Sequence, residues 1–383
     1  MSLPRVACIY PGSARDSRIA GIKTGETPKD FFYGYTGLID AKYPASIIDS
    51  RSDPASLIAR CILKAEYYRS RIMGLGINTQ RVHAIANILD GMDVAFSFTD
   101  SFSLSLGLYR DKIPNRPILV GGFHGLTDME NFARPIFRGT AHSMIKRGLD
   151  GLDHLFFFGD ADRERAIELY EQPEDKTSLF PFGIDLDFWH PPKLSEKSEG
   201  VFSVGSDPKR DYATLIKAPF EGHLRILTRL NVDIPPNRKD VEILKGNLFN
   251  STITDKVLRT LYQDSEIVAV PLLDVWQPTG YSVTLQAMAC GKPVVLSNIR
   301  GLWDRDAFIS GTNCMLVPPN DPQAFGEAIR ALQDDADLRA RIGLEARKTA
   351  QQHFALKRME NALEQMVVDL TQKTRLIDGN AFL

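Results

Sequence analysis

Residues 268–297 have the sequence VAVPLLDVWQPTGYSVTLQAMACGKPVVLS. An apolar run opens this stretch, a loop and a short helical segment follow, and a second apolar run closes it. Ser282 is placed to cap the helix by accepting a backbone N–H bond, and Gly291 supplies the left-handed residue with which many helices end. Pro293 then prevents the helix from continuing. The stretch therefore predicts one strand–helix–strand unit of a parallel sheet.

The start of this helix is also a predicted binding site for an anion. Its first N–H groups lack partners inside the helix, and the helix dipole places positive charge at that end. In a parallel sheet such a helix begins at the carboxyl edge, where ligands bind. A diphosphate fits these properties, and the backbone amides near Ser282 are the candidate binding groups.

The same alternation of strands and helices extends along the whole chain, which has 383 residues and so exceeds what one hydrophobic core usually serves. The predicted strands are Val6–Tyr10, Ala45–Ile48, Val94–Phe98, Ile118–Val120, 154–158, Val201–Val204, Leu224–Leu227, Val241–Leu244, Ile267–Pro271, Val294–Ser297 and Met315–Val317. Proline, glycine and charged residues gather at 180–200, as in an exposed connection between domains. We expect an α/β protein with domains at 1–185 and 186–355, and an amphipathic helix at 356–383 that packs back on the first domain.

Composition and charge exclude several classes of protein. The formal net charge of −2 gives no basic field of the kind that nucleic acids select, so we expect no nucleic-acid partner. The four cysteines form no CxxC pair and suggest neither a zinc site nor a disulfide framework. The sequence has no apolar run of about 18 residues and no charged-then-apolar layout of a signal peptide. We therefore expect a cytoplasmic location.

One predicted helix, residues 57–73, has an unusual charge pattern. It carries a single acid, Glu66, and a set of cations, which are Arg60, Lys64, Arg69 and Arg71. In most proteins the basic face of such a helix is exposed to solvent. The alternative is that the helix makes peripheral contact with the anionic inner face of a membrane.

Residues 286–294 have the sequence QAMACGKPV, which is similar to the signature Glu-Ala-Met-Ala-x-Gly-x-Pro-Val. The second half of the chain thereby resembles the retaining glycosyltransferases of family 4, also called group 1, which carry this signature. Residues 182–185, FGID, and the loop from Gly205 to Arg210-Asp211 agree with the family in the same order, and the likeness covers about residues 180–355. The resemblance implies the GT-B fold, in which two Rossmann-like parallel-sheet domains face a central cleft. The N-terminal domain would bind the acceptor and the C-terminal domain the nucleotide-sugar.

The resemblance also implies roles for individual residues. Gln286 replaces the glutamate that binds the ribose of the donor. The sugar hydroxyls would be contacted by Gln277, the nearest equivalent of the other family glutamate although it lies one residue further from the helix, or by the backbone amides of Gly280 and Tyr281. Arg210, with Lys209 as the alternative, would bind the diphosphate beside the Gly205 loop. The alternative is a structural role, in which Lys209 and Arg210 are solvated side chains at the start of a helix and bind no ligand.

A histidine of the first domain completes the candidate site. His124 follows a strand within the sequence VGGFHG, and in the family a histidine of this domain reaches the donor sugar. Asp100 also follows a strand and could orient an acceptor hydroxyl, although a helix cap is the commoner role for such an aspartate.

Taken together, the resemblance implies a hexosyltransferase-like, metal-independent enzyme that transfers a sugar with retention from a nucleoside-diphosphate donor to a hydroxyl acceptor, which could be a glycan, a lipid-linked sugar or a small molecule. No cofactor other than the donor substrate is expected. Asp-x-Asp occurs at several places in the chain, among them those starting at Asp160, Asp185 and Asp304, so the motif does not by itself predict a metal site. Because glutamines replace two glutamates, the alternative function is nucleotide-sugar binding with little or no transfer.

Overall fold

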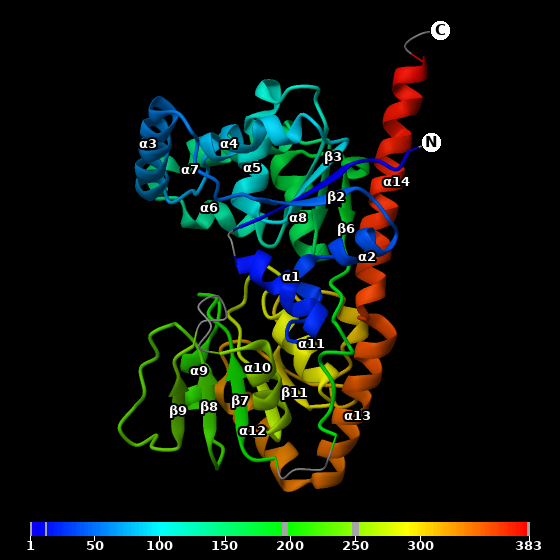
Figure 1. Cartoon of the computed structure of the whole chain (residues 1–383). Helices are drawn as coiled ribbons and strands as arrows, with labels where there is room; N and C mark the ends of the chain where they lie inside the picture. The colour runs from blue at the N-terminus through cyan, green and yellow to red at the C-terminus, as the bar shows by residue number, and fades with distance from the viewer. Residues whose placement is uncertain (1, 12–13, 194–197, 247–252, 381–383) are drawn as a thin grey trace. The chain divides into compact units, whose positions relative to one another are not determined.

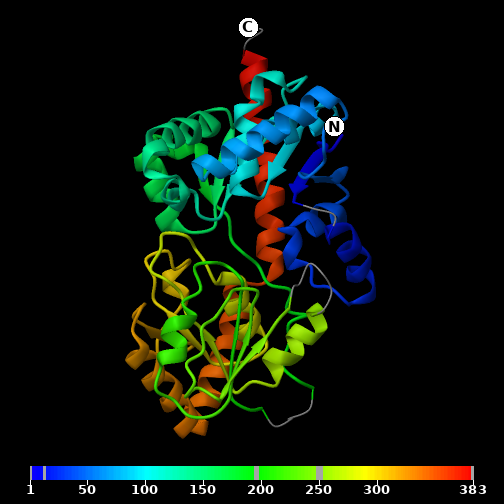
Figure 2. The ribbon, with the colours of Figure 1, turned by 90° about the vertical axis from the view of Figure 1, so that its left-hand side faces the viewer.

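The computed structural model describes residues 2–11, 14–193, 198–246 and 253–380, and Figures 1 and 2 show the chain in two views. Within these ranges the strands form two sheets of six strands each, in the orders β2-β1-β3-β4-β5-β6 and β12-β11-β10-β7-β8-β9. Every pair of neighbouring strands is parallel. The predicted α/β class with two Rossmann-like parallel sheets is confirmed.

The first sheet consists of β1 (Val6–Tyr10), β2 (Ala45–Asp49), β3 (Val94–Ser97), β4 (Ile118–Phe123), β5 (His154–Phe157) and β6 (Thr177–Leu179). The second consists of β7 (Val201–Val204), β8 (Leu224–Leu227), β9 (Val241–Leu244), β10 (Ile267–Val270), β11 (Val294–Ser297) and β12 (Met315–Val317). Strand β6 is not predicted from the sequence, because three residues at the edge of a sheet give too short a pattern to recognise.

The helices that accompany the first sheet are α2 (Tyr35–Asp40), α3 (Leu57–Met73), α4 (Thr79–Leu89), α5 (Asp100–Leu108), α6 (Met129–Phe132), α7 (Arg138–Asp150) and α8 (Asp160–Tyr170). Those of the second are α9 (Tyr212–Lys217), α10 (Asp255–Gln263), α11 (Tyr281–Ala289), α12 (Pro322–Asp334) and α13 (Ala336–His353). Two further helices, α1 (Ala14–Thr24) and α14 (Leu356–Asn380), continue from one structural unit into the other. None of the described helices is both long enough and apolar enough to cross a membrane.

The chain divides into two compact units. The first contains residues 1–16, 32–181 and 359–383, and the second contains residues 17–31 and 182–358. The sequence predicts that residues 17–31 belong to the first domain, whereas in the structure they pack with the second. The reason is a set of contacts far apart in sequence, including the ion pair between Arg18 and Asp255 at the start of α10. A contact of this kind leaves no local pattern in the sequence.

The C-terminal helix α14 packs on the first unit from Met359 onward. Met359, Leu363 and Val367 are spaced by four residues and fully buried, so they form the inner face of the helix. The Thr36 hydroxyl of α2 donates a hydrogen bond to Glu360 Oε1 at 2.9 Å.

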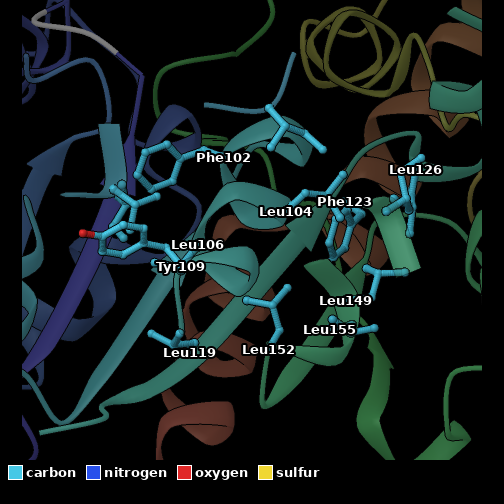
Figure 3. Packing of buried hydrophobic residues seen from close by; sticks show 14 of the residues in the cluster. Phe102, Leu104, Leu106, Tyr109, Leu119, Phe123, Leu126, Leu149, Leu152 and Leu155 are labelled. Carbon is cyan, nitrogen blue, oxygen red and sulfur yellow. The ribbon is translucent and has the colours of Figure 1, made fainter. Parts of the chain in front are cut away.

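Each unit has its own core of buried apolar side chains. In the first unit, residues of α5, β4, α7 and β5 meet against the sheet, as Figure 3 shows for Phe102, Phe123 and Leu149 among others. In the second, the central strands β10 and β11 are buried along their whole length, as expected for strands covered on both faces. These cores hold the carboxyl edges of the sheets in fixed positions.

Candidate functional site

A pocket of about 400 Å³ opens at the carboxyl edge of the second sheet. The strand order reverses there between β7 and β10, which is the point where Rossmann-type sheets bind nucleotides. The pocket is lined by Phe31, Val204, Gly205, Ser206, Asp207, Leu227, Arg229, Gly246, Ile253, Leu258, Ser282, Val283 and Gln286. Three of the predicted site residues, Gly205, Ser282 and Gln286, therefore line one pocket.

Helix α11 begins at this pocket. Its N-cap is Gly280 in the left-handed conformation, with φ of 83°, and no side chain of the described residues caps the helix. The prediction that Ser282 is the cap is wrong, because Gly280 tolerates the left-handed conformation and the helix begins one residue before Ser282, at Tyr281. Ser282 and Val283 lie in the first turn, where N–H groups have no acceptor inside the helix. The positive end of α11 therefore faces the pocket.

Arg210 lies directly against Gly205, with its guanidinium buried. The residue is 9% exposed, and its Nε and Nη1 atoms have no hydrogen-bond partner in the described part of the chain. Gly205 has φ of 148°, and a Cβ atom at this position would come within 2.2 Å of the Nε of Arg210. Glycine is required here for two reasons, the backbone conformation and the space that the guanidinium occupies. A buried cation without a partner costs free energy that a bound anion would remove.

Asp207 joins the Gly205 loop to the loop before α11. Its Oδ1 accepts the N–H of Lys209 at 2.9 Å, and its Oδ2 accepts the Thr279 hydroxyl at 3.0 Å and the Gln277 Nε2–H at 3.3 Å. Gln277 therefore binds a neighbouring carboxylate and is absent from the pocket lining. Asp207, for which the sequence predicts no role, links these two motifs although they are about 70 residues apart.

Gln286 is held by a buried tyrosine. The Tyr262 hydroxyl donates to Gln286 Oε1 at 3.0 Å, and Gln286 is only 2% exposed. Burial raises the pKa of Tyr262, so the phenol stays neutral, and the positive charge of Arg210 opposes that rise. Because Tyr262 occupies the amide oxygen, the side-chain N–H groups are the part of Gln286 that is left to donate to a ligand.

The remaining predicted residues of this unit have structural contacts. The Tyr281 ring packs between Phe182 and Trp303, with centroid distances of 4.5 and 6.0 Å. The carbonyl oxygen of Lys209 accepts the N–H of Leu273 at 2.9 Å, which fixes the loop. Neither Tyr281 nor Lys209 is among the residues that line the pocket.

One wall of the pocket comes from the N-terminal segment 17–31, which the sequence analysis did not consider. Phe31 lines the pocket, and the Arg18 guanidinium lies over its ring, 4.3 Å from the centroid. The Nη2 of Arg18 donates to Asp255 Oδ1 at 3.2 Å. Figure 1 shows this segment in blue beside α10.

Two more bonds fix the end of the same segment. The Lys29 N–H donates to Asp185 Oδ2 at 2.9 Å, and Trp189 Nε1–H donates to Asp30 Oδ1 at 3.4 Å. Asp185 also accepts the N–H groups of Asp187 and Phe188. The Asp-x-Asp pair at 185–187 therefore organises a turn, and among the described residues no group of three His, Cys, Asp or Glu side chains could hold a metal ion.

His124 belongs to the first unit, at the carboxyl edge of β4. Its ring stacks on Phe158 with a centroid distance of 4.3 Å, and its Nε2–H donates to the Phe98 carbonyl at 2.9 Å. Asp100 Oδ1 accepts the backbone N–H groups of His124 and Gly125, at 3.1 and 3.0 Å. Asp100 thus holds the turn that carries the histidine, whereas the N-cap of its own helix is Thr99.

Part of the chain is similar to known glycosyltransferases. Residues 233–335 match the family model described as glycosyl transferases group 1. A D-inositol 3-phosphate glycosyltransferase of Kineococcus radiotolerans is 26% identical over 61% of the chain and 62% of its own length. A protein of the same name from Corynebacterium urealyticum is 36% identical over 29% of the chain and 24% of its own length. The chain thus spans less than two thirds of the length of either relative.

Solved structures match over almost the whole chain. Sucrose-phosphate synthase of Thermosynechococcus elongatus has a TM-score of 0.69 with 17% identity, covering 97% of this chain and all of that one. The Anabaena protein HepE in complex with UDP and glucose has a TM-score of 0.65 with 16% identity, covering 96% of this chain and all of that one. The chain has the GT-B fold, and its residues 233–335 are similar to the group 1 glycosyltransferases. Within this GT-B protein, the family model covers the segment from β9 to α12, which includes α10, α11 and the loop that joins β10 to α11.

Proposed function

We propose that this chain transfers a sugar, with retention of configuration, from a nucleoside-diphosphate donor to a hydroxyl acceptor. One observation carries the proposal: a buried guanidinium, with two nitrogens unpartnered among the described residues, lies beside a pocket that the open end of a helix also faces. Arg210 and the first turn of α11 are two positive groups that converge on one edge of the sheet. A diphosphate is the ligand that would satisfy both.

The rest of the pocket fits a nucleoside. Gln286 would donate to a ribose hydroxyl, held in position by Tyr262. Beyond it the lining is mostly apolar, with Phe31, Leu227 and Leu258 offering surfaces against which a base could pack. The pocket volume of about 400 Å³ is within the range of small-molecule sites.

In the proposed reaction the bond between the anomeric carbon and the diphosphate oxygen breaks, and the acceptor hydroxyl forms a new bond on the same face of the sugar. The diphosphate leaves with its negative charge, which Arg210 and the N–H groups of α11 stabilise. A fixed donor of this kind contributes about 3 kcal/mol to the transition state. His124 would position the sugar, and the acceptor proton passes to the leaving diphosphate.

We also propose that these positive groups replace a metal ion, so that neither a metal nor another cofactor is required. Transfer should then continue when EDTA is added in excess. Loss of transfer in EDTA, restored by a divalent cation, would contradict this part of the proposal. The predicted cytoplasmic location stays a prediction from the sequence.

A screen of nucleotides tests the donor site. UDP, GDP and ADP are added to the full chain, and the melting temperature is measured. One of them should raise it by several degrees, because a ligand that binds only the folded state stabilises it. No rise with any nucleoside diphosphate would sink the proposal.

The sugar form of the nucleotide that binds is then incubated with candidate hydroxyl acceptors, and the anomeric configuration of the product is determined by NMR. Product with the donor's configuration supports transfer with retention. The second candidate function is donor binding without transfer, which the engagement of Gln277 by Asp207 favours. Nucleotide binding together with complete absence of transfer and of donor hydrolysis would decide for it.

A further inference from the structure

Helix α3 presents an apolar stripe to solvent. Large apolar side chains that are between 43% and 77% exposed follow one face of the helix, and these are Leu57, Ile58, Ile62, Tyr68 and Ile72. The exposed Cys61 and Ala65 lie on the same face, because all these positions follow one another at helical spacing. Figure 1 shows α3 at the periphery of the first unit. The stripe is therefore a continuous apolar surface that this unit leaves uncovered.

The opposite side of α3 is narrow and contains the one acid of the helix. Only Ala59, Glu66 and Met73 are buried. Glu66 accepts the hydroxyl and the N–H of Thr79 and the N–H of Gln80, so its charge is used to hold the first turn of α4. The exposed faces of α3 consequently carry no negative charge.

Cations border the stripe. Arg60, Lys64 and Arg71 are exposed along one flank of α3, and in the described part of the chain no ion pair involves them. The segment after α6 lies next to the C-terminal end of α3, because the N–H of Arg134 donates to the carbonyl oxygen of Met73 at 2.9 Å. That segment adds further exposed side chains, which are Arg134, Ile136 and Arg138.

We propose that this face, formed by the α3 stripe and its flanking cations, docks on an anionic membrane surface. A helix that lies in a membrane interface has an apolar side that enters the acyl boundary and basic side chains that reach the headgroups. The α3 stripe supplies the apolar side, and the flanking cations supply the basic side chains. Tyr67 and Tyr68 add amphipathic rings of the kind that gather at the depth of the headgroups.

A second copy of the chain is a poorer occupant of this face. Two copies packed stripe to stripe would bring the same cations together, and the like charges would repel. A bilayer with anionic lipids covers the apolar stripe and neutralises the cations at the same time. The net charge of −2 shows that the positive charge is local to this face and is not a property of the whole chain.

A pocket beside the stripe provides a place for one headgroup. It has a volume of about 340 Å³ and is lined by Leu63, Lys64, Tyr67, Tyr68, Asn78 and Arg81. Two cations and two tyrosines surround it, and Asn78 Oδ1 is buried without a hydrogen-bond partner in the described residues. A lipid phosphate with hydroxyls on its headgroup would match both the cations and this acceptor.

Vesicle flotation tests the proposal with the full chain. Vesicles of phosphatidylcholine and phosphatidylglycerol in equal parts are compared with vesicles of phosphatidylcholine alone. The chain should float with the anionic vesicles, bind the neutral ones about tenfold more weakly, and be released in part by high salt. Equal binding to both, or binding to neither, would overturn the proposal.

Substitutions in the stripe assign the binding to α3. Ile58→Gln with Ile72→Gln should weaken vesicle binding about tenfold, because two apolar side chains leave the stripe. The control, Ile88→Gln with Leu344→Gln, removes two exposed apolar side chains from other helices and should bind like the parent. Parental binding by the stripe variant would overturn the proposal.

Substitutions in the flank test the cations separately. Lys64→Gln with Arg71→Gln should weaken binding to anionic vesicles only, because the charges act on the headgroups. The control, Lys217→Gln with Lys239→Gln, removes two exposed cations elsewhere and should bind like the parent. Because all these side chains are exposed, each variant should keep the parent's melting temperature.

Cys61 offers a direct probe of the docked face. It is the exposed cysteine within the stripe, whereas Cys8, Cys290 and Cys314 are buried and burial raises the pKa of each thiol to about 12. An environment-sensitive fluorophore on Cys61 should shift to the blue with anionic vesicles and be quenched by lipids brominated in the acyl chain. If the protein floats with the vesicles but the emission of the fluorophore on Cys61 does not shift, another surface contacts the membrane, and the proposal is overturned. A shift that depends on protein concentration without vesicles would show that a second copy covers the stripe and would overturn the proposal.

Discussion

The carboxyl edges of the two sheets differ in what fills them. In the second unit the edge between β7 and β10 opens into the pocket, and Arg210 lies beside it with two nitrogens unpartnered among the described residues. In the first unit the edge is covered by aromatic rings that stack on one another, such as Tyr33 on Phe98 at 5.1 Å and His124 on Phe158 at 4.3 Å. Both sheets reverse their strand order near these edges.

The difference suggests a division of tasks. Unsatisfied buried donors cost free energy until an anion binds, so the second edge is suited to a charged ligand. Stacked aromatic rings pack against one another and present a flat surface with a few polar atoms. Such a surface suits a neutral sugar. We therefore expect the donor nucleotide at the second edge and the transferred or accepting sugar near the first. Four substitutions test this expectation, in order of decreasing effect.

The largest effect is expected at Arg210. Arg210→Met keeps most of the length of the side chain and removes the guanidinium, and it should lower nucleotide-sugar turnover about 100-fold, the equivalent of about 3 kcal/mol. Because two nitrogens of the buried guanidinium lack a partner in the described chain, the melting temperature without ligand should stay the same or rise. Steady-state kinetics and thermal unfolding measure the two quantities.

Arg238 is the matched control, since its guanidinium is satisfied by Asp240 and by backbone carbonyl oxygens. Arg238→Met should lower the melting temperature and leave nucleotide affinity unchanged. If instead Arg210→Met destabilises the fold and leaves turnover intact, the guanidinium is structural and the comparison of the two edges fails.

Gly205→Ala should have the second largest effect, about tenfold on nucleotide affinity. The new Cβ would lie 2.2 Å from the Nε of Arg210, so the guanidinium must move. Gly222→Ala is a control for backbone strain, because Gly222 also has positive φ, at 90°, but its Cβ would contact only Gln333 at 3.7 Å. Calorimetric titration with the nucleotide should show a loss for Gly205→Ala alone. Similar affinities for the two variants would mean that the position of Arg210 does not matter.

The sequence predicted the second edge better than the first, for a physical reason. The strand, loop and helix at 268–297 are adjacent in the chain, so local patterns define the fold there and place Ser282 and Gln286 at the pocket. Local pattern did not show that Gly280 caps α11, or that Gln277 binds Asp207. The choice of cap depends on one backbone angle, and the Gln277 contact joins segments that are distant in sequence.

Contacts between distant segments explain the other misses as well. Phe31 reaches the pocket because the segment 17–31 packs on the second unit, which depends on Arg18 meeting Asp255. In the first unit, the sequence VGGFHG indicates only that His124 follows a strand. The structure shows its ring stacked on Phe158 and bonded to Phe98. A pattern of residues can indicate that a loop ends a strand, but not which rings from other strands will cover it.

A third substitution separates the two edges. His124→Phe keeps a ring on Phe158 and removes the ring nitrogens, so the first unit should remain folded. Turnover should fall about tenfold, the cost of one polar contact in the transition state, while nucleotide affinity stays at the parental value. His223→Phe, at an exposed position of the second unit, should change neither. A fall in nucleotide affinity for His124→Phe would show that the histidine acts on the nucleotide and not on the sugar.

The smallest effect is expected at Phe31, which tests whether the segment 17–31 belongs to the pocket. Phe31→Ala removes an aromatic wall and should weaken nucleotide binding about fivefold, the equivalent of about 1 kcal/mol for one lost aromatic contact. Phe31→Trp should restore most of the affinity, since a larger ring still offers a face to the base. Phe220→Ala is the matched control, because Phe220 also lies under an arginine, Arg238, but outside the pocket. If both alanine variants bind nucleotide equally well, Phe31 only supports Arg18, and the wall of the pocket that faces the base must come from residues 182–358.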